Sequence, residues 1–424
     1  MEFVLYLLNA FLLCGLIWLL YRQSSLKSLK THLLPALGLK LLAGILLGLL
    51  YHHYYQEGDT LAFKKASVLL SDYAKQHVGS YVKLILFNEF ESETFRATVP
   101  FSRFPNFSNS FFFIKVLSLL NLLTGNQYYI NSLYLSLFSF WGGAMLVATL
   151  VNHFPKYKAA AVLSFLYFPS VVFWSSGVLK DPLLFGSMCW VIAMAVQLAE
   201  GRRLSIVNWL LLPFTLYLFY RIKFFQALIL LPLLLLYVVI KLVSKGMQER
   251  TQVLVYLSAF GLLAVAGLNL VLRYESGFFF QNLVDTYEGI LALTHARPHI
   301  AFDNLEPTVA SMLSNAPEAL YSAVYKPFLW ESVNVLYLLM SLENLFILIL
   351  SVVAALSLIK YGVKEITLLQ VCFILLIVCF GVIIGLSTPN FGTLSRYRIV
   401  FLPFLVFLLL QNHYAQKLLA KLRL

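Results

Sequence analysis

Residues 33–55 read LLPALGLKLLAGILLGLLYHHYY, and the short acidic turn QEGDT follows at residues 56–60. The run holds a single charged residue, Lys40. A helix that crosses the hydrocarbon core of a bilayer needs about 20 largely apolar residues. The run therefore predicts a membrane-spanning helix that ends at a water-facing turn. Asp59, in that turn, is either only the end of a helix or a carboxylate held at the membrane surface for chemistry.

The composition of the whole chain agrees with this prediction. The 424 residues are 60% hydrophobic and 12% charged, whereas soluble domains carry about 25% charged residues. Such a chain lacks the polar surface of a water-soluble globule, so most of it must be solvated by lipid. The net charge of +12 comes from short basic clusters between apolar runs, as the positive-inside rule predicts, and does not indicate a nucleic-acid partner.

Apolar runs of spanning length recur along the chain and predict an all-α polytopic membrane protein, a single transmembrane domain over residues 1–424. We count roughly eleven such runs: 3–21, 33–55, 132–151, 159–176, 182–199, 204–220, 224–242, 252–272, 334–358, 366–387 and 398–411. The basic segment RQSSLKSLK (22–30) is placed in the cytoplasm. Alternation then puts the other basic loops and the C-terminal tail NHYAQKLLAKLRL on the same side.

Two long hydrophilic stretches, residues 56–131 and 274–333, are left for the extracytoplasmic face. The first contains an expected amphipathic helix, TLAFKKASVLLSDYAKQ (60–76). It also contains SFFFIKVLSLLNLLTG (110–125), which is too short to span easily and is expected to lie in the membrane interface. We expect short helices and turns in the second loop.

Several cations fall on the predicted outer side, against the general distribution of charge. They are Lys180, Arg221, Lys223, Lys326, Arg396 and Arg398. A charge near hydrocarbon is costly unless a counter-anion is present, and a lipid phosphate is a natural partner for arginine, which can hold it with two parallel hydrogen bonds. The alternative interpretation is that these side chains snorkel to the headgroups of the outer leaflet.

The acids allow a similar choice. Asp59 and Asp181 each precede an expected helix, so either one could be an ordinary N-cap. Inside the expected spans, Lys40 and Glu343 are the main ionisable residues. Glu343 could be a buried hydrogen-bonded acid or a transport site. No set of residues has metal-ligand spacing: His295 and His299 are separated by a proline that argues against a shared helix.

Five segments of the chain resemble the GT-C superfamily of polytopic glycosyltransferases that use polyprenyl-phosphate sugars. They are EGDT (57–60), LLNLLTGNQYY (119–129), FPSVVFWSSGVLKDPLLF (168–185), YKPFLWESVNVLYLLMSLENL (325–345) and RYRIVFLPFLVFLL (396–409). The last two are similar to bacterial members that act in envelope polysaccharide assembly. The chain departs from the family pattern in having an extra span before the usual first one, and in separating its two acids by Gly58.

The resemblance implies a GT-C-like bundle and an inverting sugar transfer to a glycan, lipid or protein acceptor at the outer face of the cytoplasmic (inner) membrane. It implies Asp59 as the general base, with Glu57 and Asp181 as secondary acids. The donor phosphate would be held by Arg396, Arg398, Arg221, Lys223 and Lys180. No cofactor is implied with certainty, and some relatives need a divalent metal. Two alternatives remain open: an O-antigen-type polysaccharide polymerase or ligase, and a transporter or flippase for lipid-linked substrates.

Overall fold

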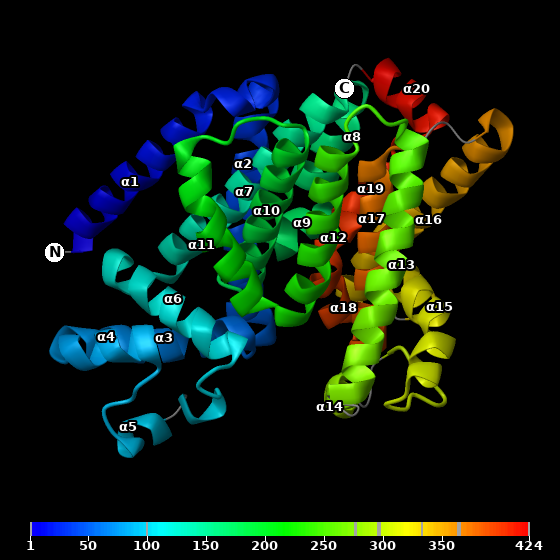
Figure 1. Cartoon of the computed structure of the whole chain (residues 1–424). Coiled ribbons are helices and arrows are strands. Elements are labelled where there is room, and N and C mark those ends of the chain that lie inside the picture. Colours follow the sequence, from blue (N-terminus) through cyan, green and yellow to red (C-terminus); the bar gives the residue numbers. More distant parts are fainter. Residues whose placement is uncertain are drawn as a thin grey trace. The chain divides into compact units, whose positions relative to one another are not determined.

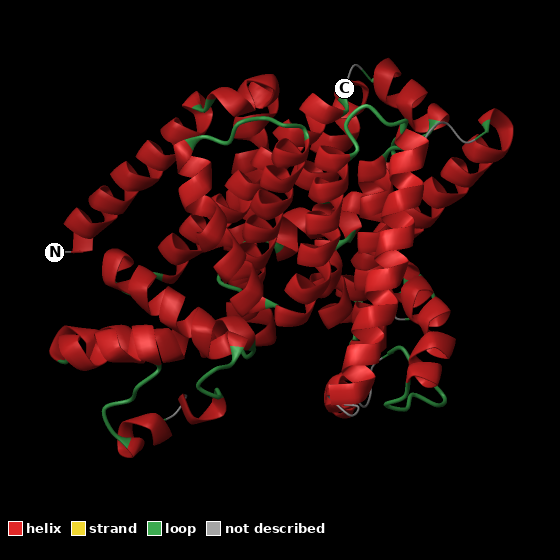
Figure 2. Cartoon of the chain, in the orientation of Figure 1, coloured by secondary structure: helices red, strands yellow, loops and turns green. Residues whose placement is uncertain are grey.

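The computed structural model of the chain describes residues 2–98, 101–274, 278–294, 298–331, 334–362 and 366–422. Most of these residues are helical, as Figure 2 shows, and the described ranges contain no strand. The only β-type pairing within them is an isolated bridge between His299 and Asn390. The prediction of an all-α fold is confirmed. The chain divides into two compact units, each described here by itself.

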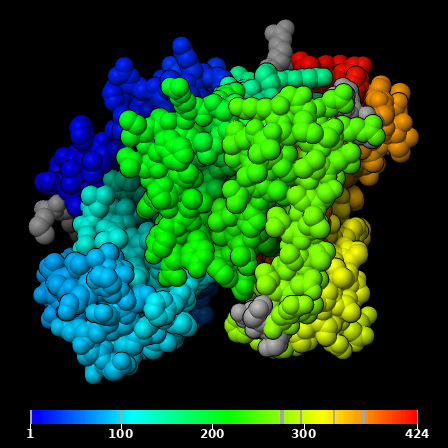
Figure 3. Space-filling model, in the orientation of Figure 1, coloured from blue at the N-terminus to red at the C-terminus, as the bar shows by residue number. Residues whose placement is uncertain are grey.

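Unit 1 contains the described residues up to Asn152, together with Val172–Ala193 and Ile206–Ala227. Its helices are α1 (Glu2–Arg22), η1 (Ser24–Leu29), α2 (Lys30–Leu49), η2 (Leu50–Tyr55), α3 (Asp59–Gln76), α4 (Val78–Phe87), α5 (Glu93–Ala97), η3 (Phe101–Arg103), α6 (Asn109–Thr124), α7 (Tyr128–His153), the first part of α10 (Asp181–Ala199), and α11 (Ile206–Ile222). The segment from α3 to α6, coloured blue to cyan in Figures 1 and 3, gathers at one end of this unit.

Close packing in unit 1 depends on small residues where α7 meets α10. A Cβ atom built on Gly142 of α7 would lie 2.2 Å from the carbonyl oxygen of Gly186 on α10. The two backbones therefore approach more closely than any residue larger than glycine allows. Small residues favour such contacts between helices in lipid, where packing replaces the hydrophobic effect as the driving force.

α1 is attached differently, because most of its surface is exposed. Among the side chains of α1 that the structure describes, the one buried polar residue is Asn9. It donates a hydrogen bond to the carbonyl of Leu123 at 3.2 Å and accepts one from the hydroxyl of Tyr134 at 3.0 Å. These two contacts join α1 to α6 and α7.

Unit 2 contains His153–Val171, Met194–Ser205 and the described residues from Leu228 onward. Its helices are η4 (Pro155–Tyr157), α8 (Lys158–Val162), η5 (Leu163–Tyr167), most of α12 (Phe224–Val243), α13 (Glu249–Tyr274), α14 (Phe278–Ala292), α15 (Val309–Tyr325), α16 (Val335–Tyr361), α17 (Leu368–Ser387), α18 (Phe391–Tyr397), η6 (Arg398–Val400), α19 (Leu402–Leu409) and α20 (His413–Lys421). α17 is central, because it packs against α13, α14, α15 and α19. Leu386 of α17 shares an apolar cluster with Leu283 of α14 and Met312 of α15.

Within the described ranges, eight helices are long and apolar enough to cross a membrane. They are Phe3–Arg22, Ser24–Tyr55, Tyr128–His153, Asp181–Ala199, Phe224–Val243, Glu249–Arg273, Val335–Tyr361 and Leu368–Ser387. Each coincides with a predicted run, so the polytopic, membrane-associated character of the chain is confirmed. A ninth span results if the bent pair Phe391–Val400 and Leu402–Leu409 is counted as one.

Three of the eleven predicted runs are not continuous long helices. Run 159–176 is divided into α8, the π-helix η5 and α9 (Pro169–Trp174), because the extended residue Phe168 precedes Pro169 and proline disfavours helical backbone before it. Run 204–220 is α11, whose 17 residues rise only about 25 Å. Run 398–411 is part of the pair that bends by 68°.

Both helices predicted in the first hydrophilic stretch are present. The amphipathic segment 60–76 is α3, which begins one residue earlier, and segment 110–125 is α6, which has 16 residues. The two helices pack side by side, with the rings of Phe63 and Phe113 in edge contact at 5.1 Å between centroids.

Candidate functional site

The start of α3 fixes the position of Asp59. The N-cap of this helix is Gly58, whose φ of +116° is open to glycine and strained for other residues. Asp59 is the first helical residue, and its side chain is exposed. The N-cap interpretation of Asp59 is therefore wrong by one position. A carboxylate in the first helical turn is stabilised by the helix dipole, and glycine between the two acids of EGDT is what the tight turn requires. Glu57 is also exposed.

The residues that follow Asp59 anchor α3 to the rest of unit 1. The buried hydroxyl of Thr60 is hydrogen-bonded to that of Tyr128, at the start of α7, at 2.7 Å. Phe63, one turn further along, is 1% exposed. Asp59 therefore projects from a helix end that is held by buried contacts in its first turn and just beyond it.

Lys180 reaches the same part of α3. Its ammonium nitrogen lies 5.5 Å from the centroid of the Phe63 ring and donates hydrogen bonds to Asn109 Oδ1 and Ser110 Oγ, both at 3.0 Å. Residues four apart on a helix lie on one face, so Lys180 covers the residue one turn along from Asp59. The predicted base and one predicted phosphate-binding cation are thus near each other in unit 1.

Arg221 approaches the first turns of α6 from the end of α11. Its guanidinium carbon lies 5.0 Å from the centroid of the Phe112 ring, and Asn109 donates a hydrogen bond to the carbonyl of the next residue, Ile222, at 3.1 Å. Because Asn109 also accepts from Lys180, one amide side chain joins α6, α10 and α11. Lys223, directly after α11, is half-buried.

A third cation, Lys115 of α6, was not singled out from the sequence. It is buried and donates to the Ile85 carbonyl at 2.9 Å and to Asn88 Oδ1 at 2.6 Å. Burial lowers the pKa of the Lys115 side chain to about 8, and the positive charge of Arg221 acts in the same direction. We call Lys115, Lys180 and Arg221 the α6 cation cluster. An anion bound at this cluster would offset the repulsion between its members.

Asp181, next to Lys180, opens α10 and is only 2% exposed, in contrast to Asp59. It is the first helical residue, since the amide of Leu184 donates to the carbonyl of Lys180 and so makes Lys180 the cap residue. Its burial is compatible with a positioning role and incompatible with direct access to solvent.

The two C-terminal arginines belong to unit 2, whereas the other six predicted site residues belong to unit 1. Arg398 is 1% exposed and donates to Glu343 Oε1 at 3.0 Å and to Asn344 Oδ1 at 2.5 Å. The second oxygen of Glu343 accepts from the backbone amide of Ser170 at 2.9 Å. Glu343 is therefore a hydrogen-bonded, ion-paired acid.

Arg396 is 7% exposed, and its guanidinium carbon lies 5.7 Å from the centroid of the Tyr397 ring. Nearby, the backbone amide of Ile300 in the second hydrophilic stretch donates to the carbonyl of Pro389 at 3.0 Å. The second stretch thus folds onto the segment that precedes the two arginines. His299 takes part in this pairing as the bridge partner of Asn390, and His295 lies outside the described residues.

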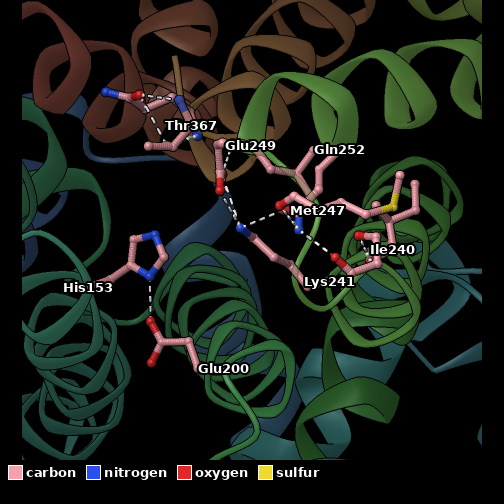
Figure 4. Close-up of polar contacts among 11 residues, drawn as sticks. His153, Glu200, Ile240, Lys241, Met247, Glu249, Gln252 and Thr367 are labelled. Atoms are coloured by element: carbon pink, nitrogen blue, oxygen red, sulfur yellow. Dashed lines mark hydrogen bonds and ion pairs between the residues drawn. The ribbon is translucent and has the colours of Figure 1, made fainter. Parts of the chain in front are cut away.

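A second set of ionic contacts in unit 2 lies among the basic loops (Figure 4). Lys241 donates to both carboxylate oxygens of Glu249, at 2.8 and 3.0 Å, and to Gln252 at 2.9 Å. Glu249 also accepts from the backbone amide of Leu368 at 2.7 Å. These contacts join the last turn of α12 to the first turn of α13 and to the first residue of α17. They are structural in character, because every carboxylate oxygen of Glu249 is occupied.

In the part of the chain that the structure describes, no group of three or more histidine, cysteine or acidic side chains could hold a metal ion. The residues that sequence reasoning missed are Asn109, Ser110, Lys115 and Asn344. Lys115 and Asn344 are polar residues in apolar segments, and Asn109 and Ser110 are neighbours in the polar stretch PNFSNS (105–110). Both signals are too common to select these residues. Comparisons of the chain with protein-family models, with curated proteins and with solved structures find no match.

Proposed function

We propose that the protein is a membrane glycosyltransferase that transfers a sugar from a polyprenyl-phosphate donor to a hydroxyl acceptor at the outer face of the cytoplasmic membrane. The observation that carries the proposal is the placement of Lys180 over Phe63, one turn from the exposed Asp59. An inverting transfer needs a carboxylate that can reach solvent and a nearby fixed cation, and these two residues supply the pair.

In the reaction, the Asp59 carboxylate takes the proton of the acceptor hydroxyl as its oxygen attacks the anomeric carbon. The bond from that carbon to the phosphate oxygen breaks on the opposite face, and its electron pair stays on the leaving lipid phosphate. Lys180 and Arg221, with Lys223 beside them, hold the negative charge that develops there. The short apolar helix α6 beside the cation cluster suits a donor whose chain stays in lipid while its sugar is in water.

The two arginines of unit 2 differ in how well they suit the role of donor-phosphate ligand. Arg398 suits a supporting role better, because its side chain is only 1% exposed and its charge is already paired with the Glu343 carboxylate. We therefore propose that Arg398 holds the backbone around Arg396 in place. Arg396 stays a proposed phosphate ligand on the basis of the sequence resemblance.

The test is transfer activity of the purified full chain in lipid nanodiscs, with a panel of radiolabelled undecaprenyl-phosphate hexoses and released envelope glycans as acceptors. Asp59→Asn is expected to lower kcat by about 10²–10⁴-fold, the usual contribution of a general base. Lys180→Gln is expected to raise KM for the donor. Asp59→Asn should keep the thermal stability of the parent protein, because Asp59 is exposed.

Asp72→Asn is the matched control, because Asp72 lies on the same helix, its side chain is 50% exposed and its ion pair with Lys75 is exposed as well. This variant should retain parental activity. If Asp59→Asn transfers sugar as fast as Asp72→Asn, Asp59 is not the base and the proposal is wrong.

The other two candidate functions predict different patterns of loss. A polymerase or ligase acting on lipid-linked glycans would depend on Arg396 and tolerate Asp59→Asn. A transporter is favoured by one observation, the Glu343–Arg398 ion pair on a candidate span. It would move lipid-linked sugar across a vesicle membrane without forming a glycosidic bond.

A further inference from the structure

Unit 2 contains a pocket of about 470 Å³ that the proposed glycosyl transfer does not use. It lies between α16, α17, α19 and α20, and its volume falls within the range of about 300–1,000 Å³ that is typical of small-molecule sites. Much of the lining is apolar and includes Ala354 of α16, Ile377 of α17 and Leu405 of α19.

The walls of the pocket are continuous with the surface that faces lipid. α16 and α17 are both candidate membrane spans, and the lining residues Leu358, Ile374 and Val378 are 52%, 43% and 39% exposed. Apolar side chains that are exposed along membrane spans contact acyl chains. An apolar chain can therefore enter this pocket from the bilayer.

The rim of the pocket is polar and lies where these spans end. Tyr361 is the last residue of α16, and Gln370 lies in the first turn of α17. His413, at the start of α20, donates its backbone amide to Ser357 Oγ at 3.2 Å, which joins α20 to α16 at this rim. Tyrosine is enriched where membrane spans meet the lipid headgroups, so Tyr361 indicates that the rim lies at the depth of the headgroups.

Gln411 supplies an unused hydrogen-bond donor at the rim. Its carbonyl oxygen accepts from Gln370 Nε2 at 2.6 Å, and its own amide nitrogen is buried without a partner. The donor direction in this pair is fixed by Gln370, whose oxygen accepts from the backbone amide of Thr367 at 2.8 Å. Burial of an unpaired donor is unfavourable, and Gln411 is one of the residues that line the pocket. A small shift of its side chain would let an ester or phosphate oxygen of a ligand accept a hydrogen bond from it.

Two lysines add positive charge beside the rim. The ammonium of Lys360 lies 5.6 Å from the ring centroid of Tyr361, and that of Lys156 lies 5.9 Å from the ring centroid of Tyr157. Both tyrosines line the pocket. The rim thus offers a buried amide donor and two cations, which is the chemistry that recognises a phosphate ester at a membrane surface.

We propose that this pocket binds an anionic phospholipid of the bilayer. One acyl chain fills the apolar part beside Ala354 and Ile377, an oxygen of the glycerol ester or phosphate accepts from Gln411, and the headgroup charge lies near Lys156 and Lys360. Because these residues flank basic segments that the positive-inside rule places in the cytoplasm, the lipid belongs to the cytoplasmic leaflet.

The experiment is native mass spectrometry of the full chain in detergent, titrated with phosphatidylglycerol or phosphatidylcholine of the same acyl composition. The parent chain should bind one phosphatidylglycerol more tightly than phosphatidylcholine. Ala354→Trp fills the pocket and should weaken phosphatidylglycerol binding at least tenfold. The control Ala355→Trp, on the neighbouring exposed position of α16, should stay within twofold of the parent.

The headgroup is tested separately. Replacement of Lys156 and Lys360 together by glutamine should lower the preference for phosphatidylglycerol by about fivefold for each lysine removed. Gln411→Leu should weaken both lipids alike, and it serves as the pocket variant if Ala354→Trp fails to fold.

Three outcomes would overturn the proposal. The first is that Ala354→Trp and Ala355→Trp bind phosphatidylglycerol equally well. If Ala354→Trp does not fold, the corresponding outcome is that Gln411→Leu binds phosphatidylglycerol as well as the parent chain does. Another is a parent chain without preference between the two lipids. The third is displacement of phosphatidylglycerol by a lower concentration of undecaprenyl phosphate, which would make the carrier lipid the occupant. None of these outcomes depends on transfer activity.

Discussion

Arg398 and Glu343 form a buried ion pair in which each partner makes the burial of the other tolerable. Their side chains are 1% and 11% exposed. An isolated charge in such surroundings costs several kcal/mol, and the cost is offset here by the pair itself, by Asn344 and by the amide of Ser170. Removal of one partner should therefore be more harmful than removal of both.

Glu343→Gln is expected to destabilise the folded chain by about 3–5 kcal/mol, because it leaves the Arg398 guanidinium buried without a counter-charge. The double change Glu343→Leu with Arg398→Met should recover most of that loss. The measurement is unfolding of the purified protein in mixed micelles of increasing denaturing detergent.

Asp72→Asn provides the comparison for this pair, since the Asp72–Lys75 ion pair is exposed and should be worth less than about 1 kcal/mol. Equal losses for Glu343→Gln and Asp72→Asn would contradict the assignment of a stabilising role to the buried pair.

Both members of the ion pair could be noticed in the sequence, but their contact could not be predicted. Glu343 is an acid within an apolar run, and Arg398 is a cation on the predicted outer side. They are 55 residues apart, and no local pattern relates them. The same holds for Lys180 and Asn109, which are 71 residues apart. Composition selected candidate residues of the site, and only the packing of helices shows which of them meet.

At the level of elements, length and apolar composition predicted the long spans well. They did not predict where a run is interrupted. Apolar composition indicates that a segment lies in the membrane, but it does not indicate whether that segment is one unbroken helix. Pro169 and Pro403 stand at the starts of α9 and α19, where two predicted runs break. Proline is also tolerated inside other helices of this chain, at Pro213 and Pro232, so its presence alone does not predict a break.

Gly142→Val tests the close approach of α7 and α10. The added Cβ would meet the backbone of Gly186, which cannot move aside as a flexible side chain could. We expect a loss of at least about 1–3 kcal/mol, which is what overpacking costs. The measurement is the thermal midpoint of aggregation in detergent.

Gly38→Val is the control for this change, since a Cβ atom on Gly38 of α2 has no neighbour within 4 Å. It should shift the midpoint little. A larger loss for Gly38→Val than for Gly142→Val would show that the α7–α10 contact is not the cause.

For the whole molecule, the distribution of basic loops predicts which side of the membrane each hydrophilic segment occupies. Two exposed positions report on it: Thr94, in the first hydrophilic stretch, and Gln248, between α12 and α13. The four native cysteines are first replaced by alanine, since Cys14 is exposed. In intact spheroplasts, a membrane-impermeant maleimide should label Thr94→Cys, and it should label Gln248→Cys only after the membrane is opened.

Labelling of Gln248→Cys in intact spheroplasts, with Thr94→Cys protected, would reverse the orientation and place the α6 cation cluster on the cytoplasmic side. Labelling of both in intact spheroplasts would mean that an even number of crossings separates the two positions, which the positive-inside assignment does not allow.

Because the only buried polar contacts of α1 among its described side chains are those of Asn9, the sequence of this helix is less constrained than the sequences of the more deeply packed helices. Most positions of this helix are exposed, so we expect exchanges among apolar residues there to be nearly neutral as long as one carboxamide remains at the level of Leu123 and Tyr134. If α1 is replaced by an unrelated apolar helix, the new helix should pack against α6 and α7 when it carries asparagine at position 9. The same helix with leucine at position 9 should not pack against them.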